Sequence, residues 1–113
     1  MDTSMEQTIS QIITRTRAIE AAMHDQNTVW SIHPMGFDGE PSPANLEVGR
    51  DFVKWVVVDP WVAPCDGEVE FYGLYADGDL VLVDRVPNAP LNLQEGDSLS
   101  LTWTLRVVRL ARR

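Results

Sequence analysis

A predicted β-hairpin in residues 68–84 constrains the fold of this chain more than any other stretch. The sequence EVEFYGLYADGDLVLVD begins with side chains that alternate with a period of two, which is typical of a strand with two different faces. The Asp77-Gly78 pair that follows supplies the positive φ angles that a tight hairpin turn needs. Because an isolated hairpin is marginally stable in water, the remaining segments must supply its packing partners.

Two further strand patterns indicate how these partners are arranged. The second half of the hairpin, Leu80–Val83, is apolar at every position, which indicates a strand covered on both faces by a second sheet, a helix or another subunit. The segment 98–107 instead alternates strictly between apolar and polar residues, as expected for an antiparallel strand with one face in solvent. Its apolar set is Leu99, Leu101, Trp103, Leu105 and Val107.

The fold predicted from these patterns is mainly β. Additional short strands are expected at 28–33, 50–59 and 91–93, separated by segments rich in proline and glycine. About seven short strands at this spacing are typical of an antiparallel β-sandwich. The length of 113 residues suits one compact domain with a core of its own.

An N-terminal α-helix is expected to precede the sandwich. Ser4 and Gln7 have the spacing of a capping box, and a helix from Met5 to His24 would follow. This helix would carry an a/d heptad stripe, and isoleucine in both core registers favours three strands. The stripe consists of Met5, Ile9, Ile12, Ile19 and Met23, interrupted by Thr16. The alternative is an ordinary amphipathic helix lying on its own domain.

The predicted domain organisation follows from this helix and the strands. Residues 1–27 are assigned to an assembly or docking helix, and residues 28–113 to the β-sandwich domain.

Charge is distributed unevenly along the chain. The net charge is −8, and residues 38–97 hold thirteen of the seventeen acidic residues but three of the nine basic ones. An acidic body argues against a nucleic-acid partner, which needs a basic surface. The C-terminal arginines are either a solvated end or a surface that meets an acidic neighbour, such as another copy of the chain. They are Arg106, Arg109, Arg112 and Arg113.

Few residues suggest catalysis, and we expect no enzyme, no cofactor and no metal site. The single cysteine, Cys65, excludes a disulfide framework and is more often a buried apolar residue than a nucleophile. The Asp77–Asp79 stretch is better explained by its turn than by calcium, because the EF-hand spacing is absent. The polar, acidic start predicts no signal peptide, and no apolar run approaches the roughly 20 residues of a membrane span.

Binding residues are sought in the longest predicted loop and at one tryptophan. Residues 34–49 are rich in proline and glycine, and such loops either carry function or merely cross between sheets. Met35 and Phe37 are the apolar candidates there. Trp61 lies between Pro60 and Pro64, and is either an exposed aromatic for binding a sugar or a protein, or a plug at the sheet edge.

Three segments in the C-terminal half carry a family resemblance. They are Val69–Ala76, Gly78–Val81 and Gly96–Leu101, with the sequences VEFYGLYA, GDLV and GDSLSL. Their order resembles that of small tail-fibre-like and head-decoration structural proteins of tailed bacteriophages. The glycine-rich segment of many members is not evident, and residues 48–51 stand in its place.

This resemblance implies a non-enzymatic virion component, assembled in the host cytoplasm, that decorates the head or forms part of the neck, collar or tail fibre. It implies a symmetric oligomer, for which the N-terminal stripe favours a trimer, and contacts with capsid, portal, neck or tail proteins. The alternative is a tip module that binds a host-surface receptor or carbohydrate. No nucleic-acid or membrane partner is expected.

Overall fold

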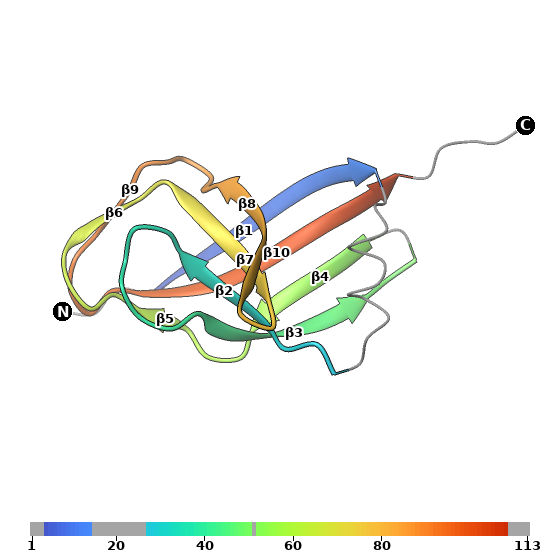
Figure 1. Cartoon of the computed structure of the whole chain (residues 1–113). Coiled ribbons are helices and arrows are strands. Elements are labelled where there is room, and N and C mark those ends of the chain that lie inside the picture. Colours follow the sequence, from blue (N-terminus) through green and yellow to red (C-terminus); the bar gives the residue numbers. More distant parts are fainter. Residues whose placement is uncertain (1–3, 15–26, 51, 109–113) are drawn as a thin grey trace, which may run out of the picture.

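The computed structural model describes residues 4–14, 27–50 and 52–108, and these contain ten strands and no helix (Figure 1). The mainly β prediction is therefore confirmed, with more strands than expected. The strands are β1 (Ser4–Thr14), β2 (Trp30–Pro34), β3 (Ser42–Val48), β4 (Phe52–Val57), β5 (Trp61–Val62), β6 (Gly67–Val69), β7 (Phe71–Ala76), β8 (Asp79–Arg85), β9 (Leu91–Leu93) and β10 (Ser98–Val108).

One sheet of eight strands dominates the fold. Its order is β1-β10-β4-β3-β2-β7-β8, and β5 pairs with β10 beside this path. Seven of the strands pair antiparallel, as the sequence predicts, whereas β1 runs parallel to β10. A second sheet consists of β6 and β9 alone. Figure 1 shows β2, β7 and β8 crossing over the strands of the other half of the main sheet.

The prediction of a helix beginning at Met5 is wrong for residues 5–14, which form strand β1 in the sheet. The segment contains Thr8, Ile9, Ile12 and Ile13, and these β-branched residues favour extended backbone when a partner strand is available. Here β10 provides that partner along the whole length of β1.

The predicted helical stripe loses its basis with this change, because a strand repeats every two residues and not every three and a half. The backbone of Met5 pairs with Leu99, that of Ile9 with Trp103 and that of Ile12 with Arg106. Ile19 and Met23 lie outside the described residues. Residues 4–14 also belong to the main sheet, so they do not form a helical segment apart from residues 28–113.

The central hairpin is confirmed as β7 and β8. Asp77 and Gly78 at its tip have φ angles of 52° and 85°, as a two-residue turn of type I′ requires. Asp77 also fixes the turn to the start of β2, because its N–H donates to the carbonyl of Val29 (2.8 Å) and its carboxylate accepts from the N–H of Val29 (2.8 Å).

The loop predicted over residues 34–49 is shorter than expected, because β3 occupies its second half. β3 lies inside the sheet between β4 and β2 although it contains Pro43. The proline has no N–H to donate, but its carbonyl accepts a hydrogen bond from Val58 (2.9 Å). The density of proline and glycine in this segment thus concealed a strand.

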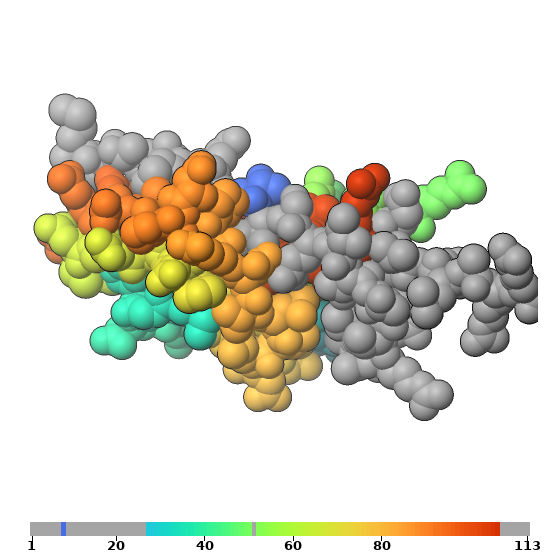
Figure 2. All heavy atoms as spheres, turned by 90° about the horizontal axis from the view of Figure 1, so that it is seen from above, coloured from blue at the N-terminus to red at the C-terminus, as the bar shows by residue number. Residues whose placement is uncertain are grey.

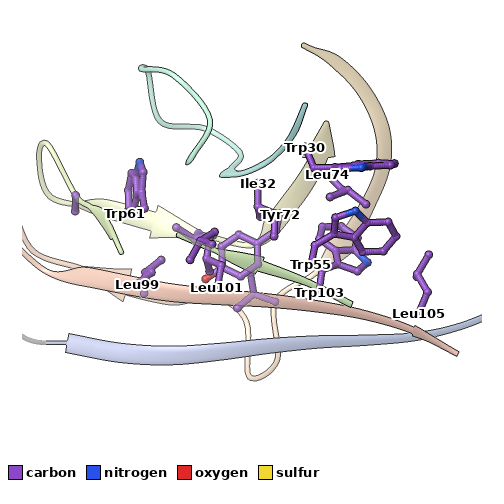
Figure 3. Packing of buried hydrophobic residues seen from close by; sticks show 14 of the residues in the cluster. Trp30, Ile32, Trp55, Trp61, Tyr72, Leu74, Leu99, Leu101, Trp103 and Leu105 are labelled. Atoms are coloured by element: carbon purple, nitrogen blue, oxygen red, sulfur yellow. The ribbon is translucent and has the colours of Figure 1, made fainter. Parts of the chain in front are cut away.

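The core lies between the two halves of the main sheet, and three tryptophans gather at one end of it (Figure 3). Trp55 of β4 pairs in register with Trp103 of β10, and its ring centroid lies 5.0 Å from that of Trp30 in β2. The inward set predicted for the last strand is confirmed for Leu99, Leu101, Trp103 and Leu105, which are all buried.

Three buried polar atoms have no hydrogen-bond partner among the described residues: His33 Nδ1, Trp55 Nε1 and the Tyr72 hydroxyl. Burial raises the pKa of Tyr72 well above its ordinary value, because the phenolate would lose its hydration. An unpaired buried hydroxyl lowers the stability of the fold relative to a hydrocarbon of the same shape.

We expect Gly78→Val to lower the free energy of unfolding by roughly 1 kcal/mol or more, because a β-branched residue is strained at positive φ. No atom lies near the added Cβ, so the loss would come from the backbone alone. Chemical denaturation measures it. Gly78→Asn is the matched control, because asparagine tolerates this conformation and should lose less. Equal losses in both variants would contradict the turn geometry.

We expect Tyr72→Phe to leave the free energy of unfolding unchanged or to raise it by up to about 1 kcal/mol, because the variant keeps the ring and removes an unpaired hydroxyl. Urea denaturation is the measurement, with Tyr75→Phe at a half-buried position as the control. A clear loss of stability would mean that the Tyr72 hydroxyl has a partner, such as a buried water.

Candidate functional site

Two loops from distant parts of the sequence enclose an open depression of about 460 Å³. The first loop follows β2 and contains two glycines at positive φ, Gly36 and Gly39. The second joins β5 to β6. The lining residues are Gly36, Phe37, Asp38, Gly39, Pro64, Cys65, Asp66, Gly67 and Glu68. Of the predicted binding residues, Phe37 alone lines this depression.

One lining residue, Phe37, belongs to an aromatic stack with two buried side chains behind it. Phe37 meets Trp61 edge-on at a centroid distance of 5.1 Å, and His33 meets the same indole at 6.1 Å. His33 Nε2 lies 2.7 Å from the carbonyl of Phe37; since a carbonyl can only accept, this nitrogen carries the proton and donates. The stack therefore fixes both the ring and the backbone of Phe37.

Trp61 is buried, with 7% of its surface exposed, so it is the plug at the sheet edge and not an exposed platform. Figure 3 shows it apart from the other three tryptophans, at the opposite end of the core. Met35 is half-buried, and its N–H donates to the carbonyl of Phe71 (2.9 Å), which holds the loop against β7. Trp61 therefore offers no free aromatic surface.

Glycine at position 67 allows the two loops to meet. A Cβ at this position would lie 2.7 Å from Cζ of Phe37, closer than side chains approach. The neighbouring Asp66 fixes the second loop, because its carboxylate accepts from the N–H of Glu95 (2.7 Å). The sequence around Gly67 gave no indication that Phe37 would be its neighbour.

The rim of the depression is acidic and carries the free thiol of Cys65. Asp38, Asp66 and Glu68 are exposed, and so is Cys65, contrary to the expectation of a buried cysteine. Such a rim suits hydrogen-bond donors and repels anions. Within the described ranges, no group of three histidine, cysteine or acidic residues is placed to hold a metal ion.

Comparisons with known proteins do not add to this picture: family models, curated proteins and solved structures were searched, and none matches the chain. In the part of the chain that the structure describes, there is no helix long and apolar enough to cross a membrane.

We expect Phe37→Ala to open Trp61 to solvent and to lower the free energy of unfolding by roughly 1–2 kcal/mol, because a half-buried ring is lost. Quenching of tryptophan fluorescence by acrylamide should increase, since the wild-type indole is covered. Phe71→Ala removes a more exposed ring on strand β7 and serves as the control, because Trp61 packs against Phe37. Equal quenching in both variants would contradict the packing of Phe37 on Trp61.

Proposed function

We propose that the chain is a non-enzymatic structural subunit of the virion of a tailed bacteriophage, a symmetric oligomer assembled in the host cytoplasm. Its place would be head decoration, neck or collar, or tail fibre, in contact with capsid, portal or tail proteins. The scaffold would be a β-sandwich whose two layers are halves of one bent sheet. The single observation that carries the proposal is the position of the three family-like segments in the fold.

Each of these segments occupies a strand or a turn. Val69–Ala76 ends β6 and forms β7, Gly78–Val81 completes the hairpin turn and begins β8, and Gly96–Leu101 leads into β10. Their polar residues also have structural roles. Asp97 is buried and accepts from the N–H of Gln94 (2.8 Å), and Gly96 has a φ of 92°. The family-like segments thus contain residues that form strands and turns of the scaffold. Such residues support a resemblance in architecture, and architecture is what a structural subunit would share with its relatives.

The test is whether the protein is a component of purified particles. Phage particles banded on a density gradient should contain the protein at a fixed ratio to the major capsid protein, measured by quantitative mass spectrometry, and antibodies should label one position on the particle in electron micrographs. The control is the same gradient fraction from a lysate in which particle assembly is blocked. Absence from intact particles would overturn the proposal.

The alternative, a tip module that binds a host-surface carbohydrate, is favoured by the depression beside Phe37, which combines an aromatic edge with acceptor groups. This function predicts that labelled protein binds host cells, and that Gly67→Ala, which displaces Phe37, weakens the binding. A wild-type protein that does not bind cells or their extracted surface glycans would exclude it.

A further inference from the structure

Strand β8 has an apolar sequence, but its side chains are exposed or half-buried in the fold. Leu80–Val83 is apolar at each position, yet no residue of β8 is fully buried. A β-bulge explains part of this, because Leu82 pairs with Leu74 and Leu80 with Tyr75, so that Val81 has no partner. Val81 and Leu82 pack against the core, while Leu80 and Val83 remain 48% and 42% exposed.

These two exposed residues belong to a wider apolar face of the hairpin. Gly73 pairs with Val83, and Phe71, which is 40% exposed, lies two residues before it on β7. A Cβ at Gly73 would lie 2.9 Å from Leu80 and 3.0 Å from the Tyr75 ring, so these side chains extend over the glycine. A contiguous apolar face on an exposed hairpin marks a contact surface. Figure 2 shows the hairpin (light orange) projecting from the body.

The same hairpin presents a free backbone edge. β8 ends the strand order of the main sheet, and among the described residues no strand pairs with its outer side. An unprotected edge strand with apolar residues is a template for another strand. The opposite end of the same sheet is also an edge, formed by β1, which pairs with no described strand other than β10.

The two edges differ in charge. The β8 edge carries the exposed Asp77 and Asp79 and the half-exposed Asp84, and its one cation, Arg85, lies 3.7 Å from Glu70 of its own chain. β1 contains one charged residue, Glu6, and β10 beside it ends close to the exposed Arg106, followed in sequence by three more arginines. Two β8 edges would repel each other, whereas the exposed Arg106 beside β1 can face the carboxylates of a β8 edge from a second copy.

We propose that the β8 edge and the apolar face formed by Phe71, Gly73, Tyr75, Leu80 and Val83 dock on the β1 edge of a second copy of this chain, head to tail. The inference rests on the self-assembly in the proposed function and names the surfaces that carry it. A contact between two different surfaces is the kind that generates a closed ring, whereas pairing of like edges gives a two-fold dimer.

The first test measures mass in solution by light scattering over a range of concentrations. The wild type should be oligomeric, and Val83→Asp should raise the dissociation constant by at least about tenfold, because an unpaired carboxylate would enter the contact. Val48→Asp, at a valine that is 66% exposed on β3, is the matched control and should not change it. A wild type that stays monomeric at high concentration, or equal effects of both variants, would overturn the inference.

The second test determines which edges meet, using chains in which Cys65 is replaced by serine. Leu80→Cys places a thiol on the β8 edge and Thr8→Cys places one at an exposed position of β1. When both variants are mixed and treated with a short bismaleimide, the expected product is the mixed pair. Cross-links between two Leu80→Cys chains would show pairing of like edges and contradict the proposal; Val48→Cys controls for random collision.

These results can be separated from the fate of the proposed function. A monomer in solution that is nevertheless found in purified particles would overturn the head-to-tail contact and leave the virion assignment intact. An oligomer that gives the expected cross-links but is absent from particles would overturn the virion assignment and leave the head-to-tail contact intact.

Discussion

The packing of Trp55 against Trp30 is the contact on which the architecture depends. Trp55 lies opposite Trp103 on the neighbouring strand, and it reaches Trp30, which belongs to the crossing half of the sheet. β3 separates β2 from β4 in the hydrogen-bond order, so the contact is possible because the sheet bends over at β3. Large aromatic side chains supply much apolar area in a small core, which explains how one sheet can form both layers.

The elements that were predicted correctly are those whose signals are local. The β7–β8 turn follows from Asp77-Gly78 alone, and the alternation in β10 follows from burial on one face. Strand β1 was missed because its spacing of isoleucines also fits a heptad, and only the distant β10 makes the extended form favourable. Strand β3 was missed because Pro43 normally argues against a strand inside a sheet, and its carbonyl bond to Val58 is not a sequence signal.

One residue of the candidate site could be predicted from the sequence, but the shape of the site could not. Phe37 was selected because it lies in a loop rich in glycine, and it does line the depression. The loop of Cys65 and Asp66, which forms the other wall, carries no motif, and its approach to Phe37 depends on the path of β5 and β6. Trp61 had two interpretations at the sequence level, since prolines bracket an exposed residue as readily as a buried one; burial decides between them.

The parallel pairing of β1 with β10 has a consequence for the order in which the chain becomes structured. Ser4 pairs with Ser98, so a segment that leaves the ribosome early stays without its partner until the last described strand has been made. Strand β10 also pairs with β4 and β5, and these two pairings must likewise wait until β10 has been synthesised. Contacts between such distant residues fold slowly. During synthesis, nascent chains on one messenger would expose unpaired edges to each other, so folding and mutual recognition would compete for the same strands.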